Sequence, residues 1–69
     1  MKSNVGAGVR VYREAQNLTQ QELAQKASTC PGTISLLERG VHPPNRNTLA
    51  RVARALRVKV KVLEQFEPV

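Results

Sequence analysis

Two short segments with helical spacing, separated by a short gap, constrain this chain more than any other feature. They cover residues 18–24 and 34–40. Two helices joined by a turn of three or four residues cross at about 90 to 120°, so the side chains at their crossing must be small or apolar. Ala24 supplies the small contact, and the apolar contacts come from Leu23, Ala27, Ile34 and Leu37. The sequence therefore predicts two short helices packed at a steep angle.

Local signals mark the ends of these two helices. Thr19 can accept a hydrogen bond from the backbone N–H three residues on, and Glu22 lies where a capping-box carboxylate returns the bond. This pattern predicts a helix over residues 20–27. Pro31 suits the first turn of a helix and Gly40 suits a left-handed C-cap, so a second helix is expected over residues 31–39.

Helical spacing of apolar residues predicts further helices on both sides of this pair. A first helix is expected within residues 5–15, beginning loosely after Gly6 and Gly8. A fourth helix, capped by Asn47 or Thr48, would bury a stripe formed by Leu49, Val52, Ala53 and Leu56. We therefore expect one all-α domain, a compact helical bundle that covers residues 1–69.

The segment after the fourth helix allows two interpretations. Residues 58–62 alternate with period two, as in a strand, whereas the apolar residues from Val62 to Phe66 suit a short helix. We favour a fifth helix.

Composition excludes several function classes. The chain has one Cys and one His, which leaves no disulfide framework and no Cys/His zinc cluster. No acid–base pair, activated nucleophile or phosphate-binding loop is visible, so we expect no enzymatic activity, no cofactor and no metal. No apolar run approaches the roughly 20 residues of a membrane span. A cytoplasmic protein with no membrane partner is expected.

Two reactive side chains have simple alternatives. Cys30, at a helix start, is either a redox-sensitive thiol or a small buried residue, and we favour the buried residue. His42 is expected to be solvated or to donate to a phosphate, since its neighbours offer no catalytic partner.

Charge points to a polyanionic partner. Eleven Lys and Arg residues oppose five Asp and Glu, which gives a net charge of +6, and no acidic residue lies between Glu38 and Glu64. Arg51, Arg54 and Arg57 lie off the buried stripe of the fourth helix. They either contribute to the long-range field or are solvated surface charges, and we favour the second interpretation for at least two of them.

Together these motifs resemble the Cro/C1-type, or Xre-like, helix-turn-helix family of phage repressor-like DNA-binding domains. The matching residues are 18–24, then Thr33, Ile34, Ser35, Glu38 and Gly40, then Leu49, Ala53, Leu56 and Val58. The resemblance covers nearly the whole chain. It implies a five-helix bundle whose third helix enters the major groove, with the helix-turn-helix at about residues 20–39 and usually a dimer on a palindromic operator.

The resemblance also implies roles for individual residues. Gln20 would contact the phosphate backbone. Thr33 is our choice for a base contact, because its hydroxyl can donate or accept and its methyl can meet a thymine methyl. Leu36 either touches a thymine methyl or belongs to the peripheral core, and Ser35 bonds either a phosphate or its own backbone. The groove-facing positions would be Pro31, Gly32, Thr33 and Leu36.

Two further sets of residues follow from the same resemblance. Arg46 and Asn47, at the start of the fourth helix, would contact the DNA backbone on the far side of the third helix. Arg13 and Glu38 match positions that form a structural ion pair between the first and third helices.

The chain departs from the family pattern in and near its third helix. Its groove-facing positions lack the Gln, Asn, Arg or Lys that make bidentate bonds to purines, so direct base readout should be thin. Cys30 replaces the usual Ser or Thr N-cap, so Ser28 or Thr29 could cap instead. Ser28 also replaces a frequent Gly in the turn, which matters if the position needs positive φ.

The leading hypothesis is a sequence-specific DNA-binding transcriptional regulator of repressor type that acts as a homodimer on double-stranded DNA. Its dimer surface would be Val60, Val62, Leu63 and Phe66 or, if the last segment is a strand, a pair of strand edges. The alternative is an antitoxin-like or regulatory protein-interaction module with secondary DNA binding. The weak base-reading set supports this alternative.

Overall fold

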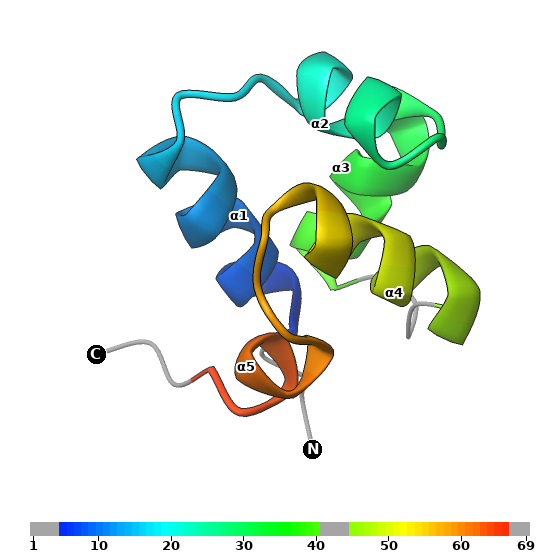
Figure 1. The fold of residues 1–69 in the computed structure, drawn as a ribbon. Helices are drawn as coiled ribbons and strands as arrows, with labels where there is room; N and C mark the ends of the chain where they lie inside the picture. The colour runs from blue at the N-terminus through cyan, green and yellow to red at the C-terminus, as the bar shows by residue number, and fades with distance from the viewer. Residues whose placement is uncertain (1–4, 41–44, 67–69) are drawn as a thin grey trace.

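The computed structural model describes residues 5–40 and 45–66, which form five helices and, within these ranges, no strand. The helices are α1 (Val5–Ala15), α2 (Gln20–Lys26), α3 (Pro31–Arg39), α4 (Arg46–Ala55) and α5 (Val60–Glu64), as Figure 1 shows. The prediction of an all-α fold with five helices is confirmed. The strand interpretation of residues 58–62 is wrong, because α5 begins at Val60.

The helices pack around one small aliphatic core. α3 contacts both α1 and α2, α4 packs on α2, and α5 closes the core against α1 and α4. In Figure 1, α5 lies by the N-terminal end of α1, away from the α2–α3 pair. The largest fully buried side chains come from all five helices or their ends: Leu23, Ile34, Leu56, Leu63, Val9 and Val52.

α1 begins at Val5 and includes both glycines, which differs from the looser start expected. Gly6 is buried because α3 approaches it closely, and a Cβ there would overlap the Leu37 carbonyl oxygen. Gly8 is buried against Phe66, whose Cβ would lie 3.1 Å from an added methyl. These tertiary contacts outweigh the cost of about 1 kcal/mol that each glycine brings to a helix interior.

The capping box of α2 is confirmed. The backbone N–H of Glu22 donates to Thr19 Oγ1 over 3.0 Å, and the backbone N–H of Thr19 donates to Glu22 Oε1 over 2.9 Å. The helix ends at Lys26, with Ala27 as its C-cap, one residue earlier than predicted.

The turn between α2 and α3 contains no side-chain cap for α3 and one residue with positive φ. Cys30 is the N-cap of α3 and makes no side-chain capping bond, so neither Ser28 nor Thr29 takes that place. Ser28 has φ +56°, which lies in the left-handed region. The glycine that is frequent at this position in the family would adopt this conformation without strain. At the other end of α3, Gly40 is the predicted left-handed C-cap, with φ +69°.

α4 begins at Arg46, earlier than expected, because Asn45 rather than Asn47 or Thr48 is its N-cap. Asn45 has extended backbone, and its Oδ1 accepts a 2.7 Å bond from the Asn47 N–H. The predicted caps are therefore wrong by two and three residues.

The described helices are all too short and too polar to cross a membrane. In the same parts of the chain, no group of three or more His, Cys, Asp or Glu residues is placed to hold a metal ion.

Candidate nucleic-acid interface

α3 buries one side and exposes the first turn of the other. Ile34 and Leu37 are buried in the core. Pro31 and Gly32 are exposed, Thr33 is half-buried, and the space around Gly32 is open for 4 Å beyond a Cβ position. The N-terminal turn of α3 therefore projects from the body, and its side chains are free to meet a ligand.

The remaining residues assigned to α3 fall on the same accessible surface. Leu36 is 41% exposed, which contradicts its interpretation as peripheral core and leaves an apolar side chain facing outward. Ser35 is half-buried. Cys30 is exposed, so the expectation of a small buried cysteine is wrong. The exposed side of the first two turns of α3 is mostly apolar, with the Thr33 and Ser35 hydroxyls as its polar groups, and the exposed Arg39 lies at the C-terminal end of the helix.

Arg13 and Glu38 form the expected ion pair. The Arg13 Nε atom donates to Glu38 Oε2 over 2.7 Å, and Nη2 donates to Oε1 over 3.1 Å. The side chains are only 12% and 5% exposed, and the bond to Glu38 raises the pKa of Arg13 above its ordinary value. This bidentate pair holds the C-terminal end of α3 against α1.

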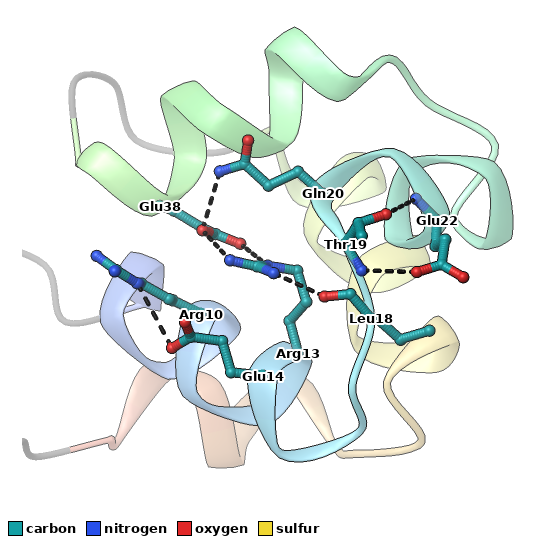
Figure 2. Close-up of polar contacts among 8 residues, drawn as sticks. All are labelled: Arg10, Arg13, Glu14, Leu18, Thr19, Gln20, Glu22 and Glu38. Carbon is teal, nitrogen blue, oxygen red and sulfur yellow. Dashed lines mark hydrogen bonds and ion pairs between the residues drawn. The ribbon is translucent and has the colours of Figure 1, made fainter.

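Two further hydrogen bonds extend this pair into a network that the sequence did not reveal. Arg13 Nη1 donates to the Leu18 carbonyl oxygen over 2.7 Å, which fixes the segment before α2. Gln20 Nε2 donates to Glu38 Oε1 over 3.2 Å. Figure 2 shows the side chains of Arg13 and Gln20 converging on Glu38. Arg13 has five N–H donors and the Glu38 carboxylate has about four acceptor sites, so both members of the pair can bind further groups, but no sequence pattern says which ones.

Gln20 can donate to a second acceptor besides Glu38. It is the first residue of α2, and its side-chain amide nitrogen carries two hydrogens, one of which is hydrogen-bonded to Glu38. The other can donate outward, beside the N–H groups at the helix start, where the helix dipole favours an anion.

The start of α4 adds a second polar edge. Arg46 and Asn47 are both exposed, at the first two positions of the helix. Residues 41–44 lie outside the described ranges, and the expectation for His42 falls among them.

The four residues assigned to a dimer surface divide between the core and the exterior. Leu63 is wrong as a surface residue, because it is 0% exposed in the core of its own chain. Val60 and Phe66 are half-buried, and the Phe66 ring meets Tyr12 edge to face with centroids 6.3 Å apart. Val62 is the exposed member, at 38%. The short α5 is needed to cover α1, which the sequence pattern could not show.

A bundle whose second and third helices form a tight pair, with the third projecting at its N-terminus, is a helix-turn-helix domain. The helix-turn-helix family profile matches residues 9–63. The chain belongs to this family, in its Cro/C1-type branch.

Relatives and solved structures agree with this assignment. Multiprotein-bridging factor 1 of Candida albicans is 38% identical over 65 residues, which cover 94% of this chain and 43% of the relative. The immunity repressor protein of Bacillus phage phi105 is 34% identical over 59 residues, which cover 86% and 41%. The chain thus spans less than half the length of these relatives.

The structure of the biofilm regulator SinR in complex with DNA superposes with a TM-score of 0.81 at 30% identity, covering 86% of this chain and 95% of that one.

Proposed function

We propose that this chain is the DNA-binding domain of a transcriptional regulator of repressor type, with α3 in the major groove of double-stranded DNA. The observation that carries the proposal is the asymmetry of α3, whose Ile34 and Leu37 side chains are buried while Pro31 and Gly32 in its first turn are exposed. The family assignment and the likeness to a structure in complex with DNA support it.

Different residues would contact the phosphate backbone and the bases. Gln20 would donate its free amide hydrogen to a phosphate, and Arg46 and Asn47 would hold the backbone beyond the other edge of α3. Within the groove, the Thr33 hydroxyl would bond a base edge and Leu36 would meet a thymine methyl. Because α3 offers few polar groups, sequence-dependent DNA shape would supply part of the specificity.

Repression would follow from a homodimer that occludes a promoter in the cytoplasm. Two copies of α3 would enter successive major grooves about 34 Å apart on a palindromic operator. With Leu63 buried, Val62 and the outer edges of Val60 and Phe66 remain for the dimer surface.

The test is binding of this chain to a duplex selected from a random library, compared with a random-sequence duplex over a range of salt. The selected duplex should bind at least about 10³-fold tighter, and log K should fall by several units per log unit of salt. Thr33→Ala should weaken binding at one base step only, whereas Gln20→Ala should weaken every sequence alike. A library that yields no preferred duplex would refute the proposal.

A second candidate is a protein-bridging module, which one relative favours by its name. Multiprotein-bridging factor 1 is 38% identical over nearly the whole chain. The small base-reading set on α3 agrees with a protein partner. A folded chain that selects no preferred duplex from the random library would favour this candidate.

A further inference from the structure

The arginines of α4 have no carboxylate partner in the described parts of the chain. Arg46, Arg51 and Arg54 are exposed, and both ion pairs within residues 5–40 and 45–66 involve side chains of α1. Arg51 and Arg54 are three residues apart, so they face the same side of the helix and repel each other. This arrangement leaves a cationic surface open to an anion.

An open surface pocket of about 370 Å³, called the α4 cavity below, lies beside Arg51 and Arg54. It is lined by Asn47, Ala50, Arg51 and Arg54, which share one helical face at spacings of three and four residues. Ala50 is exposed and contributes only a methyl group to this lining. Since a water molecule occupies about 30 Å³, the cavity has room for a phosphate group with several waters.

The Arg51 guanidinium is already held at this cavity. Nη1 donates to the Ser28 carbonyl oxygen over 3.3 Å, and Nε donates to the Asn47 carbonyl oxygen over 3.4 Å. These bonds occupy two of its five N–H donors, so three remain. A planar guanidinium with free donors fits the oxygens of a phosphate in a bidentate manner.

The cavity is continuous with the proposed DNA interface on two sides. Asn47 lines the cavity and also belongs to the backbone-contacting start of α4. Ser28, which Arg51 contacts, lies in the turn two residues before the N-cap of α3. An anion in the cavity would therefore lie beside the helix that we place in the groove.

We propose that this α4 cavity binds a phosphate of the DNA backbone, next to the phosphate held at Asn47. The inference rests on the proposed function and extends its contact surface beyond the start of α4. Arg51 donates hydrogen bonds to the phosphate, and Arg54 adds positive charge beside it. The contact positions the domain and carries no base preference.

The experiment compares Arg51→Gln and Ala50→Glu with Arg10→Gln, a control with the same net charge. Arg10 is exposed on α1 and pairs with Glu14, away from the cavity. Arg51→Gln and Ala50→Glu should weaken the selected and the random-sequence duplex by the same factor. The slope of log K against log salt should fall by about 0.9, the value for one phosphate. Arg10→Gln should keep the wild-type slope, and a thermal melt of each variant checks folding.

A set of selected duplexes in which single phosphates are replaced by neutral methylphosphonates locates the contact. One replacement should weaken the wild type but cause no further loss in Arg51→Gln. Equal slopes for Arg51→Gln and Arg10→Gln would overturn the phosphate site and leave this surface for an acidic protein. A wild type that selects no duplex would instead refute the proposed function.

Discussion

Arg13 Nε lies 2.7 Å from Glu38 Oε2, in a pair that joins the C-terminal part of α1 to that of α3. The same arginine binds the Leu18 carbonyl oxygen, and the same carboxylate accepts from Gln20. Four segments of the chain therefore meet at one nearly dry ion pair, which sets the orientation of α3 relative to the start of α2.

Arg13→Met should strongly destabilise the domain, because it leaves the Glu38 carboxylate buried without its cation. Loss of one member of such a pair costs about 3 to 5 kcal/mol, measurable by urea denaturation. The double variant Arg13→Met/Glu38→Leu should recover most of this loss. The exposed Arg10–Glu14 pair, 3.5 Å apart on α1, is the control, and Arg10→Gln should cost less than about 0.5 kcal/mol. Similar costs for the two single variants would contradict a structural role for Arg13.

Two glycine substitutions should have opposite effects on stability. In Gly6→Ala the new methyl would overlap the Leu37 carbonyl oxygen, so α1 and α3 must separate, at a cost of about 1 to 3 kcal/mol. In Gly32→Ala the methyl meets nothing within 4 Å, and higher helix propensity should add up to about 1 kcal/mol. Thermal melts of the two variants give the comparison. A stabilised Gly6→Ala would show that the close contact of α1 with α3 is absent in solution.

Ser28→Gly should stabilise the turn before α3. Ser28 has φ +56°, a conformation that costs a residue with a Cβ about 1 kcal/mol or more and glycine very little. Asn17, with φ +58°, is the matched control, because asparagine tolerates this region and Asn17→Gly should gain less. Equal gains in urea denaturation would show that Ser28 is not strained.

The capping box should make part of the stability depend on pH. The bond from the Thr19 backbone N–H is the main cause that lowers the pKa of Glu22 below its usual 4.5. A carboxyl with a lowered folded pKa stabilises the fold above its unfolded pKa, and this contribution is lost as the pH falls through the folded pKa. Between about pH 5 and pH 3 the wild type should therefore lose more stability than Glu22→Gln, whose amide oxygen still accepts the bond. Parallel pH profiles would contradict this.

Local signals predicted those parts of the fold that depend on neighbouring residues. Thr19 and Glu22 specify the start of α2, and Gly40 the end of α3, because each acts on backbone groups a few residues away. Asn45 carries the same kind of signal for α4, but two later polar residues offered equally good caps. Within the described ranges, helix ends were thus predictable where one capping residue had no competitor.

Contacts between distant segments were not predictable in the same way. Gly6 disfavours a helix in isolation, and only the backbone of α3 lying against it explains why it is helical. Leu63 has the same apolar character in a core as on a dimer surface, and only the packing of α5 on α1 distinguishes the two. Of the candidate site, the Arg13–Glu38 pair followed from the family pattern, but the bond from Gln20 did not.

Because Cys30 provides no side-chain cap, the two ends of α3 are held in different ways. Its C-terminal part is fixed by the Arg13–Glu38 ion pair, whereas its N-cap makes no side-chain hydrogen bond and the first buried side chain of the helix is Ile34. From Glu38 to Pro31 the helix is about 10 Å long, so a tilt of about 6° about Glu38 displaces Pro31 by about 1 Å. Such a displacement is about a third of a hydrogen-bond length. In the proposed interface, substitutions at Arg13 or Glu38 would therefore change which bases the N-terminal turn of α3 reaches, although both residues lie away from that turn.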